Sequence, residues 1–280
     1  MKQEHEQERE QEREREQERE REQEREQERE HGQESESERT PRPVDGFCWL
    51  DLKTHDPAGT ADFFRTDLGW RFAVDPDDWR QATVIRSGPY RIGSVSDLSA
   101  PVYPPGTPPH IAYYLATDDT DRRAAAATGA GARLVVPPFD AGDQGRMATL
   151  VDPFGAAVSL WQAREFGGWA FPPGAPGTPL RALHTSGDPE AARRFYGEVL
   201  GVALPRDRFA RGPVPGWELV IGVDEPADRP LDGCPDRRPD GPSDESADGG
   251  PARRVSRAPE GTAFPLAGLP ATGVTRAARP

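Results

Sequence analysis

Aromatic and polar residues suited to holding a small organic molecule occur in three strand-like runs, residues 47–52, 111–117 and 156–161. Side chains alternate between the two faces of a strand, so the aromatic and polar members of each run share one face. This set is Trp49, Asp51, Tyr114, Ser159 and Trp161. Aromatic walls with a few polar groups suit a flat or cationic organic ligand. The alternative is that these rings only fill a sheet face or a module interface.

Other chemical motifs are missing from the sequence. The pair Gly129 and Gly131 follows a helical pattern and lacks the third glycine of a dinucleotide-binding loop, so it is interpreted as a helix stop. The chain has no P-loop, no Gly-x-Ser-x-Gly elbow and no clustered Cys/His set. Nucleotide binding and serine hydrolysis are therefore not predicted.

The elements that position these residues occupy the middle of the chain. The formal net charge of −13 comes mostly from residues 1–40, a Glu/Gln/Arg low-complexity tail. We expect this tail to be disordered or a frayed, solvated helix, the alternative being a polyelectrolyte docking arm. Residues 223–280 are rich in Pro and Gly with one aromatic residue, which predicts a disordered tail. Their composition also resembles GC-rich DNA translated out of frame.

Composition further limits the cellular setting and the partners. No run of 18 apolar residues is present, and the N-terminus lacks the apolar stretch of a signal peptide. Cys48 and Cys234 are far apart, so we expect no disulfide framework and a cytoplasmic location. The acidic balance of the chain argues against nucleic acid as a partner, and no membrane contact is expected.

Residues 45–163 contain two successive β-α-β-β-β patterns. In the first, Asp56 and Pro57 form a helix start, and Gly69 ends that helix. A Pro/Gly linker, residues 164–177, follows the second pattern, and residues 178–222 then begin a third.

The third pattern repeats the first at a fixed distance of 132 residues. The residues Asp56, Pro57, Phe63, Phe64, Leu68 and Gly69 recur as Asp188, Pro189, Phe195, Tyr196, Leu200 and Gly201. A helix cap, a fixed first φ, two aromatic anchors and a glycine stop are needed each time, so internal repetition is the strongest signal in the chain.

Five motifs, taken in their order along the chain, resemble those of a known family. They are residues 47–70, 114–119, 136–140, 145–148 and 152–155, followed by Leu160, Trp161 and Gln162. Together they resemble the vicinal oxygen chelate superfamily of glyoxalases, extradiol dioxygenases and bleomycin-resistance proteins, and especially its actinobacterial two-module type. The resemblance covers residues 45–163 as a complete module and residues 178–222 as an incomplete second module.

The resemblance implies an α+β fold in which paired βαβββ modules form a curled mixed sheet with the helices outside. The curled sheet would be a cup walled by Trp49, Tyr114, Trp161 and Phe154, with Asp51 and Arg146 as polar anchors beside Ser159. The incomplete module would expose a sheet edge, which would dock on the first module, stay loose or pair with another chain as a homodimer.

Metal-using members of this family hold a divalent ion with His and Glu on cup-facing strand positions. The motifs map these positions onto Trp49, Ala112 and Ser159, which are not ligands of such ions, and a slip of two residues offers only Asp51 and His110. His184 has no visible partner. We therefore expect no metal or other cofactor and a metal-free protein that binds a small organic molecule in the cup. The alternative is a metal-dependent lyase, isomerase or dioxygenase that uses atypical ligands.

Overall fold

The first module is an eight-stranded mixed sheet made of two β-α-β-β-β units. The computed structural model describes residues 41, 43–75, 82–224 and 254–269, and all of its secondary structure belongs to one compact unit of the chain. The first unit comprises β1 (Phe47–Thr54), α2 (Pro57–Leu68), β2 (Arg71–Val74), β3 (Thr83–Ser87) and β4 (Tyr90–Asp97). The second comprises β5 (His110–Ala116), α3 (Thr120–Gly129), β6 (Arg133–Ala141), β7 (Gly145–Val151) and β8 (Ala157–Ala163).

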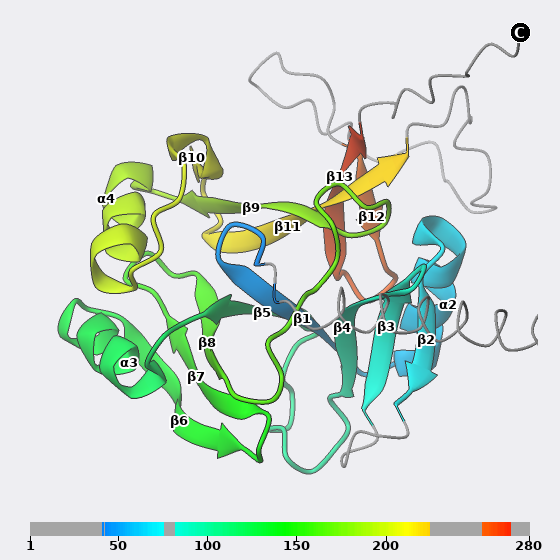
Figure 1. The fold of residues 1–280 in the computed structure, drawn as a ribbon, viewed down its shortest axis with the longest axis horizontal. Helices are drawn as coiled ribbons and strands as arrows, with labels where there is room; N and C mark the ends of the chain where they lie inside the picture. Colours follow the sequence, from blue (N-terminus) through cyan, green and yellow to red (C-terminus); the bar gives the residue numbers. More distant parts are fainter. Residues whose placement is uncertain (1–40, 42, 76–81, 225–253, 270–280) are drawn as a thin grey trace, which may run out of the picture. The chain divides into compact units, whose positions relative to one another are not determined.

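The two units meet at their first strands. The strand order is β2-β3-β4-β1-β5-β8-β7-β6. The central pair β1 and β5 is antiparallel, and each of these strands pairs in parallel with the last strand of its own unit, β4 or β8. This arrangement confirms the expected α+β fold of paired βαβββ units (Figure 1).

Local sequence signals set the ends of the helices as expected. The Asp56 side chain accepts a hydrogen bond from the Gly59 amide at 2.9 Å, which satisfies one of the free amides at the start of α2. Gly69 ends the helix with φ of 68°, a left-handed conformation that glycine adopts without strain. Asp119 caps α3 in the same way, through the Arg122 amide.

Strand β1 is buried on both faces, and the faces differ in chemistry. The Thr54 hydroxyl hydrogen-bonds to Thr60 of α2, which places Thr54, Leu52 and Leu50 on the helix side by alternation. Trp49, Asp51 and Lys53 therefore point to the opposite side. We call that side of the eight-stranded sheet, which also carries Tyr114, Ser159 and Trp161, the aromatic face.

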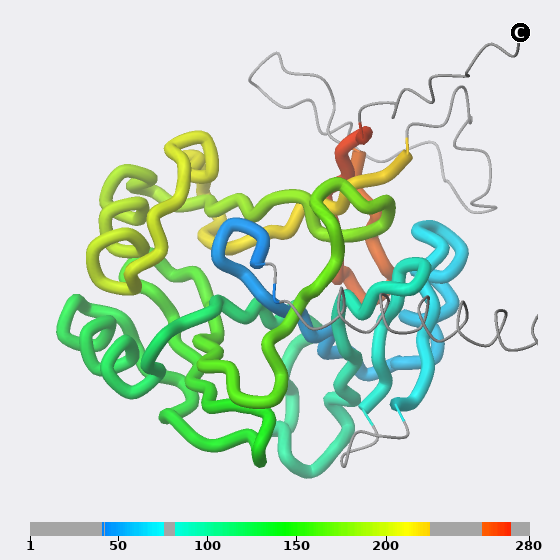
Figure 2. Tube along the Cα trace, in the orientation of Figure 1, coloured from blue at the N-terminus to red at the C-terminus, as the bar shows by residue number. Residues whose placement is uncertain are grey.

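A second sheet follows the linker. It comprises β9 (Pro179–Ser186), β10 (Phe209–Arg211), β11 (Gly216–Asp224), β12 (Val255–Arg257) and β13 (Ala263–Leu269) in the order β10-β9-β11-β13-β12. Between β9 and β10 lie α4 (Pro189–Arg194), a π-helical turn η1 (Phe195–Val199) and a short 3-10 turn η2 (Arg206–Arg208). In Figure 2 the orange-red segment that carries β12 and β13 lies beside the yellow strand β11.

The second sheet repeats the centre of the first. Its order corresponds to β4-β1-β5-β8-β7, and its registers match: Leu115 pairs with Leu160 in the first sheet, and Ile221 pairs with Leu266 in the second, each 106 residues later. The turns before β8 and β13 also match. Gly155 and Gly261 both have positive φ, 105° and 95°, and both donate to the carbonyl three residues earlier.

This repeat corrects two expectations about the end of the chain. Residues 178–222 are not the whole of the second module, because β12 and β13 complete its sheet. Residues 254–269 are not a disordered tail, and their in-frame match to residues 148–163 speaks against a shifted frame there. Periodicity missed this segment because it is short and isolated between Pro/Gly-rich stretches. The low-complexity tail 1–40 and residues 225–253 and 270–280 lie outside the described residues.

The two modules contact each other through their helix-bearing sides. The ring of Phe47 on β1 meets that of Trp217 on β11 with centroids 4.8 Å apart, and Phe264 on β13 packs 5.5 Å from Phe64 of α2. Figure 1 shows α2 beside β12 and β13, and α3 beside α4. The edge of β11 that was expected to be open is therefore covered by the chain itself. No helix in the described part of the chain is long and apolar enough to cross a membrane.

Candidate functional site

A buried carboxylate forms the polar centre of the aromatic face. Asp51 is 5% exposed. Its Oδ2 accepts hydrogen bonds from Lys53 Nζ and Ser96 Oγ, both at 2.7 Å, and its Oδ1 accepts one from Ser94 Oγ at 3.1 Å. Three donors, one of them charged, thus compensate for the lost hydration of the carboxylate.

Strand register produces this polar centre. Strands β1 and β4 are parallel, with Asp51 opposite Ser94 and Lys53 opposite Ser96, so alternate positions of both strands share one side. The loop after β4 adds Tyr103, whose hydroxyl accepts from Lys53 Nζ at 3.0 Å and whose ring centroid lies 4.8 Å from it. Burial is the largest single effect on Lys53 and lowers its pKa, but Asp51, with Tyr114 and Tyr103, raises the pKa above its ordinary value.

Aromatic rings line the sheet beside this polar centre. We call the rings of Trp49, Tyr114, Trp161 and Phe166 the wall. Trp49 donates from Nε1 to Ser94 Oγ at 3.1 Å, which connects the wall to the polar centre. Phe166, from the linker, meets the Trp49 ring edge-to-face with centroids 4.8 Å apart and the Trp161 ring at 6.1 Å. Trp161 lies 6.3 Å from Tyr114 and donates from Nε1 to the Phe166 carbonyl at 2.9 Å. The linker is therefore part of the wall.

Five of the seven predicted site residues share the aromatic face: Trp49, Asp51, Tyr114, Ser159 and Trp161. The Ser159 hydroxyl is bonded to that of Thr149 at 2.9 Å and is buried, so Ser159 lies within the sheet face and is not an exposed anchor.

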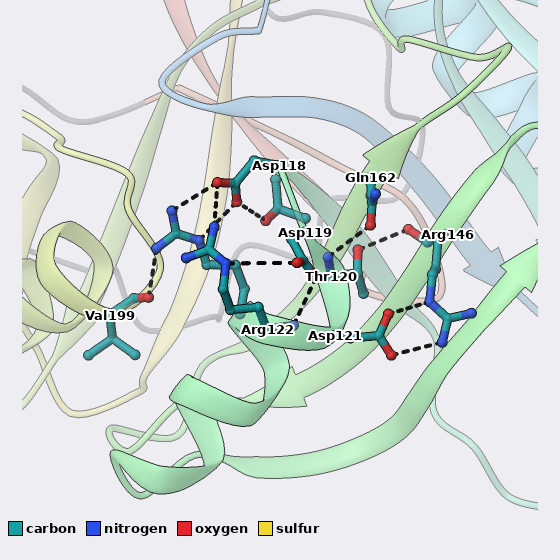
Figure 3. Close-up of polar contacts among 10 residues, drawn as sticks. Asp118, Asp119, Thr120, Asp121, Arg122, Arg146, Gln162 and Val199 are labelled. Carbon is teal, nitrogen blue, oxygen red and sulfur yellow. Dashed lines mark hydrogen bonds and ion pairs between the residues drawn. The ribbon is translucent and has the colours of Figure 1, made fainter.

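Arg146 points to the other side of the sheet, toward α3. Its guanidinium makes two bonds with Asp121, at 2.6 and 2.9 Å (Figure 3). It makes one with Asp140 at 3.1 Å. These bonds raise the pKa of Arg146 and lower that of Asp121. The cause is register: Arg146 follows Gly145, whose missing side chain makes room for the Trp161 ring, and neighbouring residues on a strand point to opposite faces.

The polar cluster in Figure 3 fastens the start of α3. The Thr120 amide donates to Gln162 Oε1 at 3.0 Å, and the Thr120 hydroxyl donates to the Arg146 carbonyl at 3.1 Å. Asp118 accepts from both Arg122 and Arg123. The hydrogen bond from Arg123 is the main reason that the pKa of Asp118 falls to about 2. Every charge in this cluster has an opposite partner, so its role is structural.

Phe154 also lies outside the aromatic face. It sits in the turn before β8, where its ring packs 6.5 Å from that of His184 and 6.3 Å from that of Phe195, both in the second module. The same turn supplies the partner that the sequence did not reveal for His184: Asp152, whose Oδ2 lies 3.0 Å from His184 Nε2. Both residues thus belong to the contact between modules.

Several residues of the polar centre escaped sequence reasoning. Lys53, Ser94 and Ser96 continue the alternation that located Asp51, so extending β1 and β4 by one repeat would have found them. Tyr103 and Phe166 come from irregular segments, where no periodicity predicts which way a side chain points.

The described residues do not fit the metal site of the family at the mapped positions. Trp49 and Ala112 offer no metal donor, and the Ser159 hydroxyl is bonded to Thr149. His110 faces Lys53 across the sheet, and Asp51 is already held by three donors. No group of three or more His, Cys, Asp or Glu side chains that could hold a metal occurs in the described ranges. Burial raises the pKa of the Cys48 thiol to about 12, which keeps it from acting as a thiolate ligand.

Comparisons with known proteins find several that are similar to this chain. The chain is 29% identical over 205 residues to "Putative glyoxylase CFP32" of Mycobacterium tuberculosis, covering 63% of this chain and 77% of that protein. It is 32% identical over 194 residues to the anthracycline biosynthesis protein DnrV of Streptomyces peucetius, covering 63% of this chain and 70% of that one. The Mn(II)-bound glyoxalase from Novosphingobium aromaticivorans superposes with a TM-score of 0.43 at 13% identity, over 65% of this chain and 66% of that one.

A family model covers most of the first module. It matches residues 47–160, from the start of β1 to the middle of β8, the segment whose strands carry the aromatic face. Together with the relative DnrV, this match shows that the chain belongs to the Glyoxalase/Bleomycin resistance protein/Dioxygenase superfamily.

Proposed function

We propose that this protein binds a flat, uncharged aromatic molecule on the aromatic face of its first module, without a metal ion. The observation that carries the proposal is the buried Asp51–Lys53 pair with its serine hydroxyls, set against the wall of Trp49 and Trp161. A ligand ring would contact the small part of the wall that stays exposed, 9% of Trp49 and 7% of Trp161, and its oxygen atoms would meet the polar centre.

Charge balance favours a neutral ligand. The Lys53 ammonium is matched by Asp51 at 2.7 Å, and the Arg91 guanidinium beside Phe166 is matched by Asp75 at 2.7 Å. A charged ligand would have to give up its hydration without finding an uncompensated opposite charge, which costs free energy in a largely buried site. Hydroxyl and carbonyl groups of a neutral ligand can exchange hydrogen bonds with Ser96 and Tyr103 instead.

The relatives are compatible with this ligand class. One of them is named as an anthracycline biosynthesis protein, and anthracyclines contain fused aromatic rings. The donor set on the aromatic face favours binding over metal-assisted chemistry, because the mapped positions Trp49 and Ala112 cannot ligate an ion. A metal-dependent lyase, isomerase or dioxygenase with atypical ligands is the competing function, and the test below separates the two.

The experiment uses 1,8-dihydroxyanthraquinone, a neutral planar probe, with the full chain. We expect it to raise the melting temperature, because a ligand at about 100 times its Kd stabilises the native state by about 2.7 kcal/mol. Ser96→Ala and Trp161→Leu should weaken binding, and Ser99→Ala, an exposed serine in the loop after β4, should not.

Two results would overturn the proposal. One is the absence of any thermal shift with this probe and related neutral aromatics. The other is a stoichiometric divalent ion in the purified protein, found by elemental analysis, whose removal lowers the melting temperature. The second result would support the metal-dependent alternative.

We also infer a cytoplasmic location, which the free thiol of Cys48 supports. A homodimer is a separate proposal. Since β13 covers β11, the edge strands of the second sheet are β10 and β12, and a second copy that pairs with this sheet would add to one of them. Sedimentation of the full chain at several concentrations tests whether a dimer forms.

A further inference from the structure

The second module retains the strands of the first but not its binding surface. Because the registers correspond at offsets of 132 and 106 residues, each position of the aromatic face has an equivalent in the second sheet. Leu183 replaces Asp51, and Thr185 replaces Lys53. The remaining replacements are Arg181 for Trp49, Val220 for Tyr114, Ala210 for Ser96, Pro265 for Ser159 and Ala267 for Trp161. The buried carboxylate, its lysine and the rings of Trp49, Tyr114 and Trp161 are absent from these equivalent positions.

The helix-bearing side of the second module, in contrast, carries its own polar and aromatic contacts to the first. His184 Nε2 and the Tyr196 hydroxyl both bond Asp152 Oδ2, at 3.0 and 2.9 Å, and Trp217 Nε1 donates to the Tyr196 hydroxyl at 2.7 Å. Asp152 immediately precedes the turn that leads into β8, the strand of Trp161. The second module therefore fixes the start of one wall strand.

A second set of contacts fixes the end of β1. Glu260, in the turn before β13, accepts hydrogen bonds from the Thr54 hydroxyl and from the His55 amide, the latter at 3.1 Å. Thr54 is the last residue of β1, and the residues after it start α2. The positive end of the α2 helix dipole also stabilises a carboxylate at this place. Strand β1 carries Trp49, Asp51 and Lys53, so this contact holds the polar centre.

In a third contact, a side chain of the first module holds a helix end of the second. Arg123 of α3 donates to the Val199 carbonyl at the end of η1, at 3.2 Å, and its guanidinium lies against Gly201, where any side chain would collide with it. A cation at the carbonyl end of a helix is favourable for the same electrostatic reason. The two modules thus exchange charged contacts at helix ends.

We propose that the second module is a clamp that holds the end of β1 and the start of β8. It is not a second binding site, so each chain binds one ligand, on the first module. The inference deepens the proposed function, on which its ligand stoichiometry rests. The clamp itself stands on contacts that need no ligand, so the two can fail separately.

The first measurement is a calorimetric titration of the full chain with 1,8-dihydroxyanthraquinone. We expect one site per chain, and a chain with Arg181→Ala and Glu218→Gln on the second sheet should keep its affinity within about two-fold. Two sites, or a lost site in this variant, would overturn the inference. No binding to either module would overturn the proposed function and leave the decision on the clamp to the second measurement.

The second measurement is amide hydrogen exchange without ligand. Glu260→Ala should speed exchange across residues 52–60 by about ten-fold, because the end of β1 and the start of α2 lose their anchor. Glu198→Ala, an exposed carboxylate on the same module, is the matched control and should leave these amides unchanged. Equal exchange in Glu260→Ala and the control would show that the second module does not hold β1.

Discussion

His184 Nε2 lies 3.0 Å from Asp152 Oδ2, and both side chains are fully buried where the two modules meet. The same carboxyl group accepts from the Tyr196 hydroxyl and from the amides of Phe154 and Ala156. Burial, followed by the charge of Asp152, raises the pKa of Tyr196 well above its usual value, so it stays a donor. One side chain of the first module thus organises the core of the second.

Removing the Asp152 carboxyl group should lower the stability of the whole protein. Asp152→Ala leaves four donors without an acceptor in a buried place, and we expect the free energy of unfolding to fall by about 3–5 kcal/mol. Urea unfolding followed by tryptophan fluorescence measures the loss. Asp143→Ala, an exposed aspartate that accepts from the Gln144 side chain, is the control and should change stability by less than about 0.5 kcal/mol. Similar values for both variants would contradict the inter-module role of Asp152.

Truncating Phe264 tests whether β13 belongs to the folded protein in solution. Its ring is fully buried and packs 5.3 Å from Trp70 and 5.5 Å from Phe64. Phe264→Ala should cost about 3–5 kcal/mol, from lost burial and a cavity. Phe139→Ala is the matched control because that ring, on the edge strand β6, is 44% exposed. A Phe264→Ala chain as stable as this control would mean that residues 254–269 are not docked.

The Asp51–Lys53 pair should show strong coupling in a double-mutant cycle. Asp51→Asn and Lys53→Met each leave a partner without its opposite charge, whereas the double variant removes both, so we expect a coupling energy of about 1–3 kcal/mol from unfolding curves. The pKa of Lys53 is raised in the native state, so this stabilisation is complete below its ordinary pKa of 10.5 and is lost as the pH rises further. A cycle that closes to zero at neutral pH would rule out the pair as the polar centre.

Arg123 should control the titration of Asp118. Its hydrogen bond, more than the charge of Arg122, lowers the pKa of Asp118 to about 2. Because the pKa is depressed, the contribution of Asp118 to stability is present above its ordinary value of 3.8 and is lost as the pH falls toward 2. In Arg123→Ala the pKa measured by carboxyl-carbon NMR should return toward 3.8, and in Arg122→Ala it should move less. The reverse order would contradict the assignment of the main partner.

The first module was predictable from sequence because its signals are local and repeated. Strand alternation placed Trp49 and Asp51 on one face, and Asp56, Pro57 and Gly69 set the ends of α2. The five predicted residues that do share the aromatic face follow from the same period-2 rule. The expectation of Arg146 as a polar anchor came from the family resemblance. Met147 lies opposite Trp161, so alternation along β7 places Arg146 on the other side of the sheet, where it bonds Asp121 of α3.

The parts that could not be predicted depend on contacts distant in sequence. Phe166 reaches the wall because the linker hydrogen-bonds to the turn at residues 143–144, and nothing in its own neighbourhood requires that. Strands β11 and β13 pair although they are separated in the sequence by a stretch whose composition suggests no strand. Its signal was present as the 106-residue match of Gly155 with Gly261 and of Leu160 with Leu266, but these isolated identities indicate no repeat without the paired registers.

The exchange of turns between the modules has a consequence for anyone who wishes to dissect this protein. The Asp152 side chain contacts the second module, and the Phe264 side chain packs against the first. Separating the modules at the linker would therefore remove from each one a side chain that the other supplies. We expect that neither half folds as an independent unit. Engineering the ligand surface alone will therefore require the whole of residues 43–269, or a redesign of the apolar sides that separation would leave bare.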